Sequence, residues 1–235
     1  MKQKAFLVTL QDDVVISASG ATTGGHRGLN HLPGATFLVA AAGEIYHRFD
    51  RERAWQLFHS GWLRFNYALP ITDTGHATYP VPLCWHHAKG KKPLRDLGEP
   101  PDLLENHLHI APAQRRKAEQ LRPDRHGFVS LAGKREHHPL GLTMKTAIDP
   151  ATGRASEGQL FGYTSLPAGA RFLFTLEASD FLNDDLLKQV ADALIGEQRL
   201  GRSRSAEYGR VEMQLLEAEL SSPEMAPEPH QSLTL

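Results

Sequence analysis

The chain has 235 residues, of which 40% are hydrophobic, so it can bury a sizeable core in one large domain or two small ones. Its formal net charge is −1, which excludes the basic overall field of a protein that coats nucleic acid non-specifically. Any RNA site therefore has to be local. The single cysteine, Cys84, excludes an intramolecular disulfide framework and a cysteine-based zinc ribbon.

The start of the sequence lacks the apolar core and the cleavage site of a signal peptide. No run anywhere in the chain approaches 18 apolar residues. The low cysteine content fits a reducing compartment. We therefore expect a cytoplasmic protein without a membrane contact.

The first predicted elements are a strand, a glycine-rich turn and a helix. Apolar and β-branched residues predict a strand over 4–17, bent near Asp12 and Asp13. The glycine-rich turn at 20–28 precedes small and apolar residues that predict a helix over 35–46. This turn has neither the Gly-Lys-Ser/Thr of a Walker motif nor the downstream acid of a dinucleotide-binding fingerprint. We expect no cofactor.

The middle of the chain predicts short elements around an insertion. Residues 48–64 favour a short helix that breaks at Gly61, and 63–69 favour a strand. The prolines of 79–85 exclude a helix and indicate an extended piece at a sheet edge. Prolines, charges and histidines over 89–125 indicate a solvent-facing insertion. Strands are predicted at 128–131 and 140–149.

The last third predicts a hairpin, a helix and a final strand. Residues 158–164 and 170–177 flank the Leu-Pro-Ala-Gly turn at 166–169 and predict a hairpin. Residues 183–195 form the clearest amphipathic helix, with Asn183 or Asp184 as its N-cap. A strand is predicted over 211–220, and a tail over 221–235.

The most informative stretch is the loop over 196–211, which we call the arginine loop. It contains Gly196, Gly201 and Gly209, four arginines (Arg199, Arg202, Arg204 and Arg210), and Ser203 and Ser205. Glycine allows close backbone approach, and arginine forks pair with phosphate oxygens, so the loop suits an RNA backbone. The alternative is an ordinary solvated surface connection.

Three close histidine pairs, at 86–87, 107/109 and 137–138, raise the question of a metal site. None has the i, i+4 spacing with an adjacent glutamate that a helical zinc site uses, and all lie in polar, proline-rich surroundings. We expect surface histidines and no metal.

The order of elements is similar to a ferredoxin-like (RRM-like) α+β core with an antiparallel sheet. The residues themselves resemble the RAMP superfamily of CRISPR effector subunits, in particular the Cas-five-like subunit of type III-D complexes. The segments that carry this resemblance are Leu-Pro-Gly-Ala at 32–35, Tyr-Pro-Val-Pro-Leu at 79–83, Met-Lys-Thr-Ala-Ile-Asp-Pro-Ala-Thr-Gly-Arg-Ala at 144–155 with Gly-Gln-Leu-Phe at 158–161, Leu-Pro-Ala-Gly-Ala-Arg-Phe at 166–172, and Leu-Gly-Arg-Ser-Arg-Ser-Ala-Glu-Tyr-Gly-Arg-Val at 200–211.

The resemblance implies a single RAMP domain over 1–220, with the insertion at about 89–125 and the tail at 221–235. One departure is that Thr36 and Phe37 stand where the family usually has an Arg-Gly pair. It also implies a non-catalytic subunit of a hetero-oligomeric ribonucleoprotein in antiviral defence. Such a subunit holds the 5′ repeat-derived tag of a guide RNA, caps the backbone filament, and docks on a Cas-seven-type backbone subunit and, in many systems, a large subunit.

The expected RNA contacts follow from that resemblance together with the residue chemistry. In the arginine loop they are Arg199, Gly201, Arg202, Ser203, Arg204, Ser205, Tyr208, Gly209 and Arg210, with Tyr208 as a stacking platform. Second-rank candidates are His26, Arg27, Lys134, Arg135 and Lys145.

Other functions stay open at this point. A guide-RNA-processing, metal-independent endoribonuclease would use His26, Tyr208 or Lys145 for general acid–base chemistry. A metal-assisted RNA cutter would use Asp12, Asp13 or Asp149, although these positions also fit strand ends and turns. A protein-interaction adaptor would make no RNA contact.

Overall fold

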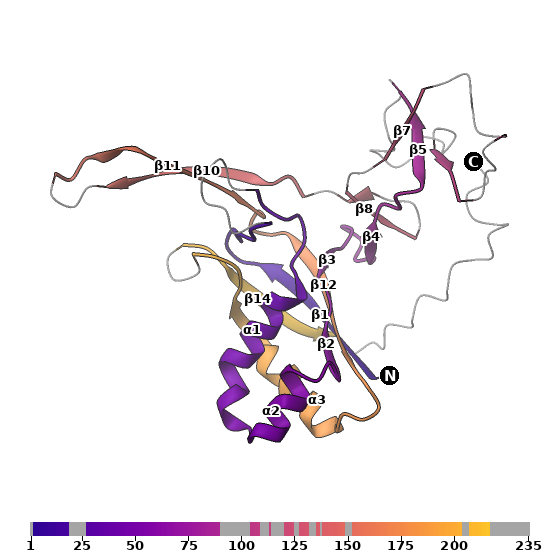
Figure 1. The fold of residues 1–235 in the computed structure, drawn as a ribbon, viewed down its shortest axis with the longest axis vertical. Helices are drawn as coiled ribbons and strands as arrows, with labels where there is room; N and C mark the ends of the chain where they lie inside the picture. Colours follow the sequence, from indigo (N-terminus) through magenta and orange to yellow (C-terminus); the bar gives the residue numbers. More distant parts are fainter. Residues whose placement is uncertain are drawn as a thin grey trace. The chain divides into compact units, whose positions relative to one another are not determined.

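The computed structural model describes residues 2–18, 27–89, 104–108, 113, 120–124, 127–131, 135–136, 138–148, 152–203 and 207–216 (Figure 1). The chain divides into two compact units. Unit 1 comprises residues 1–69 and 138–219, and unit 2 comprises 70–137 and 220–235. None of the described helices is long and apolar enough to cross a membrane.

Unit 1 is built on an antiparallel sheet with the strand order β13–β14–β1–β12–β2, and β3 pairs with β12 off this path. Its strands are β1 (Lys2–Leu10), β2 (Leu63–Phe65), β3 (Leu69–Pro70), β12 (Arg171–Ala178), β13 (Gly196–Arg199) and β14 (Arg210–Leu216). The first predicted strand does bend where expected, because β1 ends at Leu10 and residues 14–17 make only isolated bridges. Strand β13 lies inside the predicted arginine loop, which is therefore partly a hairpin.

Three helices and one 3-10 turn belong to unit 1: α1 (Gly34–Ile45), η1 (Tyr46–Arg48), α2 (Arg51–Phe58) and α3 (Asp184–Leu194). Helix α2 begins after Asp50, whose carboxylate accepts a hydrogen bond from the Arg53 amide at 2.9 Å. Helix α2 ends at Phe58, before Gly61, which has a φ of +77°. All three helices are close to their predicted spans.

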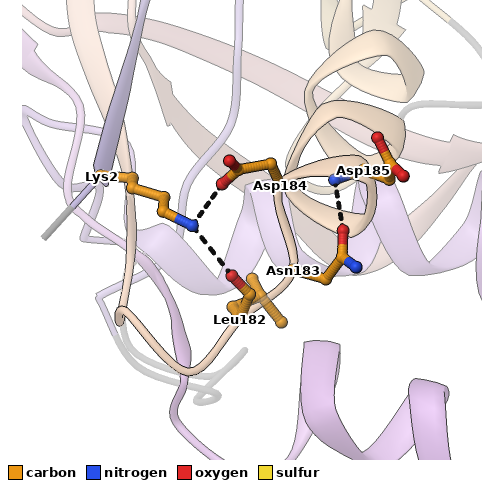
Figure 2. Close-up of polar contacts among 5 residues, drawn as sticks. All are labelled: Lys2, Leu182, Asn183, Asp184 and Asp185. Carbon is orange, nitrogen blue, oxygen red and sulfur yellow. Dashed lines mark hydrogen bonds and ion pairs between the residues drawn. The ribbon is translucent and has the colours of Figure 1, made fainter.

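The start of α3 is joined to the start of β1 (Figure 2). Asn183 is the N-cap, and its side-chain oxygen accepts a hydrogen bond from the Asp185 amide at 2.7 Å. The Lys2 ammonium donates to the Leu182 carbonyl at 3.2 Å and forms an ion pair with Asp184. The Asp184 side chain is well exposed and that of Lys2 is partly exposed, so we assign this pair little stability and mainly a role in positioning.

The core of unit 1 lies between one face of the sheet and the helices. Alternate strand residues, Phe6, Val8 and Leu10 in β1 and Phe172, Phe174 and Leu176 in β12, are buried on this face. The Phe37 ring of α1 stacks on Phe174 with centroids 4.0 Å apart. Leu7, Thr9 and Leu173, which alternate with the core positions, are only half-buried. The helices thus cover one face of the sheet.

A separate hairpin in unit 1 pairs β10 (Gly141–Ile148) with β11 (Ala155–Ser165). The predicted hairpin between 158–164 and 170–177 is therefore wrong, since β12 pairs instead with β1 and β2. The segment between β11 and β12 explains why these two strands do not pair. The Leu166 amide and carbonyl bond to Val14, so the chain leaves β11 for a different sheet before β12 begins.

Unit 2 holds two three-stranded sheets with the orders β4–β8–β9 and β6–β5–β7. Their strands are β4 (Thr78–Pro80), β5 (Trp85–Ala88), β6 (Leu104–Asn106), β7 (Leu121–Pro123), β8 (Phe128–Ser130) and β9 (Arg135–Glu136). The proline-containing strand β4 lies at a sheet edge, as predicted. Most of the predicted insertion over 89–125 lies outside the described residues.

Two glycines of α1 give opposite stability predictions. A Cβ at Gly34 would overlap the backbone oxygen of Phe65, whereas a Cβ at Gly43 would meet nothing within 4 Å. We expect Gly34→Ala to lower the free energy of unfolding by about 1–3 kcal/mol through overpacking. The control Gly43→Ala should raise it by about 0.5–1 kcal/mol, because alanine loses less backbone entropy in a helix. Urea denaturation measures both, and equal effects would contradict the packing assigned to Gly34.

Candidate nucleic-acid interface

The arginine loop is attached by backbone hydrogen bonds to the segment at 13–17, which follows the bend after β1 and which we call the central segment. The Leu200 amide donates to the Gly209 carbonyl at 2.8 Å and closes the loop at its base. The Gly209 amide then donates to Asp13, and the Arg202 amide to Val15, each at 2.9 Å. Both ends of the arginine loop are thus held in place by main-chain contacts.

The two glycines of the loop base serve this attachment. Gly201 has a φ of +82°, and a Cβ there would lie 2.5 Å from the Val15 carbonyl oxygen. Gly209 has a φ of +91°. From the sequence, both glycines were expected to allow close approach of RNA. In the structure it is instead the central segment that approaches these glycines closely. Both also adopt a positive φ, a backbone conformation that glycine adopts without strain.

Two arginines lie on either side of Ser17 in the central segment. The Arg202 guanidinium donates to the Ser17 hydroxyl at 3.3 Å, and its side chain is exposed. On the other side, Ser17 pairs with Gly28, and the Ala18 amide donates to the carbonyl of the exposed Arg27 at 2.8 Å. Residues far apart in sequence therefore place two exposed cations along one short segment.

Two further arginines stand opposite each other in the hairpin register, Arg199 in β13 and Arg210 in β14. Like charges directly opposite repel. The Arg210 guanidinium donates to the Asp12 carboxylate at 3.2 Å, with both side chains partly exposed, so one of the two charges is partly offset.

Asp13 is a structural residue, although its sequence context suggested at most a weak metal ligand. One carboxylate oxygen accepts from the Ser165 hydroxyl at 2.8 Å, and the other accepts from the Ala168 amide at 3.0 Å. Asp13 thereby joins the central segment to the turn between β11 and β12. Among the residues that the structure describes, no group of three or more His, Cys, Asp or Glu side chains is placed to hold a metal ion.

The expected role of Tyr208 as a stacking platform needs a correction. Its side chain is only 5% exposed, and its ring lies 6.4 Å from that of Tyr163 in β11. A base cannot stack on a ring whose faces are covered by protein. Tyr208 packs the arginine loop against the β10–β11 hairpin, and Ser203, with a φ of +53°, stays exposed.

Arg135, a second-rank RNA candidate, is also corrected. It belongs to unit 2, where its guanidinium pairs with Asp124, and both side chains are nearly buried, at 10% and 1% exposure. In a buried ion pair of this kind each charge is neutralised by its partner, so the Arg135 guanidinium is not available to bind a phosphate. His26, Lys134, Arg204 and Ser205 lie outside the described residues, and Lys145 lies in β10 with its side chain outside them. Their proposed RNA contacts stay predictions.

The histidines of unit 2 are packed against each other. The rings of His86 and His107 stack with centroids 3.7 Å apart and an interplanar angle of 14°, a face-to-face contact between the rings. Burial lowers the pKa of His87, and the neighbouring charges of Arg135, Arg122 and His86 lower it further. His87 is therefore neutral near pH 7.

Comparisons with known proteins connect this architecture to CRISPR assemblies. No protein-family model and no curated protein matches the sequence. A chain from the cryo-EM structure of type III-B Cmr-beta in the apo state aligns with a TM-score of 0.53 at 9% identity, over 92% of this chain and 97% of that one. A chain from a type IV-B CRISPR complex aligns with a TM-score of 0.52 at 11% identity, over 96% and 95%.

A third match is a chain from type III-B Cmr-beta bound to cognate target RNA, with a TM-score of 0.51 at 10% identity over 92% of this chain and 97% of that one. At such low identities the likeness concerns the fold. The chain therefore shares its overall fold with subunits of type III-B and type IV-B CRISPR complexes. The predicted α+β class with an antiparallel sheet is confirmed.

Removing the Asp13 carboxylate should destabilise unit 1. We expect Asp13→Ala to lower the free energy of unfolding by about 1–3 kcal/mol, because the buried Ser165 hydroxyl and the Ala168 amide lose their acceptors. Asp13→Asn is the matched control, since its amide can still accept from Ala168. The coupling between Asp13→Ala and Ser165→Ala in a double-mutant cycle measures the side-chain bond, and strict additivity would contradict it.

The lowered pKa of His87 predicts a pH-dependent stability. The unfolded chain binds a proton near the usual value of 6.5, whereas folded His87 binds it only at lower pH. Stability should therefore fall as the pH drops from above 6.5 toward the folded pKa. His87→Gln should flatten this dependence in urea denaturation series. An unchanged slope in His87→Gln would contradict the assignment.

Proposed function

We propose that this chain is a non-catalytic RNA-binding subunit of a CRISPR effector complex, which holds the 5′ repeat-derived tag of a guide RNA and caps one end of the backbone filament. The fold shared with chains of type III-B and type IV-B complexes supports a place in such an assembly. Its partners would be the guide RNA, a Cas-seven-type backbone subunit and a large subunit, in the cytoplasm.

The observation that carries the RNA assignment is the set of exposed arginines around the central segment. Arg27 and Arg202 flank Ser17, and Arg199 stands opposite Arg210. Because main-chain bonds hold the arginine loop, its cations are partly preorganised, and binding a phosphate backbone costs less ordering entropy. This local site also reconciles RNA binding with a net charge of −1.

The topology of unit 1 supports the finer relation to the RAMP superfamily. Strands β14, β1, β12 and β2 lie side by side in that order, with α1 between β1 and β2 in the chain and α3 between β12 and β14. This order supports the ferredoxin-like core that we propose for unit 1. In such a core the loop before the last strand lies at the end of the first strand. The arginine loop accordingly lies at the end of β1, beside the central segment.

The burial of Tyr208 weighs against the endoribonuclease hypothesis. A general acid or base has to reach the reacting ribose or phosphate, and the Tyr208 ring packs against Tyr163 instead. The other two acid–base candidates, His26 and Lys145, have no described side chain. A holder without cleavage is thus the function that the described geometry favours.

The arginine loop gives the sharpest test. We expect Arg202→Ala combined with Arg204→Ala to weaken guide-RNA retention about 10-fold or more and to lower the salt slope of binding by about 0.7 for each phosphate that is no longer neutralised. Stability should change little, because the exposed Arg202 side chain contributes little to it. Arg53→Ala with Lys188→Ala removes the same charge from helices α2 and α3 and should leave RNA affinity nearly unchanged. Equal weakening in both double variants would indicate a non-specific charge effect and reject the site.

Co-purification tests the proposed place in the complex. The chain is expressed with its neighbouring genes and a repeat array, and the RNA bound to it is sequenced. We expect discrete RNAs that share one 5′ repeat-derived tag and a single copy of this chain in each complex by native mass spectrometry. Protein partners without such RNA would support the adaptor hypothesis, several copies would contradict the capping position, and cleavage of labelled repeat RNA by the purified chain would support the endoribonuclease.

A further inference from the structure

A pocket of about 490 Å³ lies on the helical side of unit 1, outside the arginine loop and the central segment. Five side chains line it: Tyr46, Arg51, Glu52, Trp55 and His59. Tyr46 opens the 3-10 turn η1, and the other four come from α2 and its C-cap position. The volume is in the range of small-ligand sites in proteins. None of these residues belongs to the core, and the proposed RNA-holding function does not use them.

The lining follows from the sequence of α2. Arg51, Trp55 and His59 are four residues apart and therefore form one row on the same side of the helix, with Glu52 beside Trp55. This row does not face the core, since the buried residues of α2 are Ala54, Leu57 and Phe58. Trp55 is 52% exposed and Tyr46 is 43% exposed, so both rings are accessible to a ligand.

The aromatic walls are held in place by their neighbours. The Trp55 ring meets Trp62 edge-on, with centroids 6.0 Å apart. The Tyr46 hydroxyl lies 3.2 Å from His59 Nε2, and the two rings are perpendicular at 5.9 Å. Tyr46 also packs on the buried Phe58 at 5.4 Å. The pocket is thus largely preformed, and a ligand would cost little side-chain ordering.

The polar groups select the kind of ligand. Exposed aromatic faces stack planar rings, the Glu52 carboxylate only accepts hydrogen bonds, and the Arg51 guanidinium pairs with anions. A ligand that satisfies all three has a planar body, an edge that donates N–H groups and a negative charge. A simple cation such as a lysine or arginine side chain would be attracted by Glu52 but repelled by Arg51.

Guanine nucleotides have these three features. The Watson–Crick edge of guanine carries two adjacent N–H donors that match one carboxylate, whereas the corresponding edge of adenine presents a ring acceptor that would be repelled by it. We infer that the pocket formed by Tyr46, Arg51, Glu52, Trp55 and His59 binds a guanine nucleotide, either free or as a guanosine within RNA. The base stacks on Trp55 and Tyr46, Glu52 accepts from its edge, and Arg51 pairs with its phosphate.

This inference does not rest on the arginine loop. The pocket residues come from η1, α2 and its C-cap position in the helical layer, whereas the arginine loop comprises β13, the start of β14 and the residues between them. A failure of either assignment therefore leaves the other standing. Arg202→Ala with Arg204→Ala should leave nucleotide binding in the pocket unchanged, which separates the two sites experimentally.

Calorimetric titration of the full chain with GMP, AMP, CMP and UMP tests the inference. We expect GMP to bind about 10-fold tighter than the other three, as one good bidentate base contact allows. Trp55→Ala should abolish binding, and Trp55→Phe should retain part of it. Glu52→Gln should remove the preference for GMP over AMP, and Arg51→Ala should remove the advantage of GMP over guanosine.

Two control variants separate the pocket from general surface effects. Phe181→Ala removes an aromatic ring that is 81% exposed and packs on Trp62 outside the pocket lining, and Arg53→Ala removes an arginine from the same helix. Both should bind GMP as the unchanged chain does. Titration with short RNAs that carry a single guanosine distinguishes the two sources, because tighter binding than GMP indicates RNA and weaker binding indicates a free nucleotide.

The inference is overturned if GMP shows no saturable binding at millimolar concentration, or if all four mononucleotides bind equally. It is also overturned if Trp55→Ala leaves GMP binding intact. Capture of a protein by this surface, abolished by Trp55→Ala in the absence of any nucleotide binding, would reassign the aromatic residues to a protein contact. Thermal unfolding of each variant confirms that the fold is retained.

Discussion

The central segment at 13–17 is the constraint on which the rest of unit 1 depends. Its main-chain groups form hydrogen bonds on alternate sides, as those of an inner strand do. Val14 bonds to Leu166 and Ile16 to Leu29 on one side, whereas Val15 bonds to Arg202 on the other. Val14 and Val15 are fully buried. Three segments that are remote in sequence therefore meet on this short stretch, and Arg27 and Arg202 owe their places to this meeting.

The same constraint explains the pattern of glycines and of polar side chains nearby. Gly201 is required because the Val15 carbonyl lies where a Cβ would be, and Asp13 is required because two donors converge on its carboxylate. These residues position the arginine loop without contacting a ligand. A substitution there would affect the proposed RNA site indirectly, and unfolding measurements distinguish that effect from the removal of a side chain that is proposed to bind RNA directly.

Unit 1 thus has two chemically different surfaces that we propose to contact nucleotides. At the arginine loop, cations outnumber carboxylates, which suits a phosphate backbone read without regard to sequence. At the α2 pocket, aromatic rings and one carboxylate suit a single base. If both proposals hold, the subunit would hold a strand by its backbone at one site and recognise a guanine at another.

Local patterns were sufficient to predict the elements with strong periodicity. The amphipathic run of α3, its Asn183 cap and the bend after β1 follow from spacing and cap chemistry. The position of the arginine loop also follows, because glycines and arginines interrupt that periodicity between a helix and a strand. By contrast, the partner of β11, the burial of Tyr208, the Arg135–Asp124 pair and the α2 pocket were decided only by the tertiary structure. Periodicity specifies which side of an element is apolar, but contacts between distant segments compete with one another, and their outcome depends on how the whole chain packs.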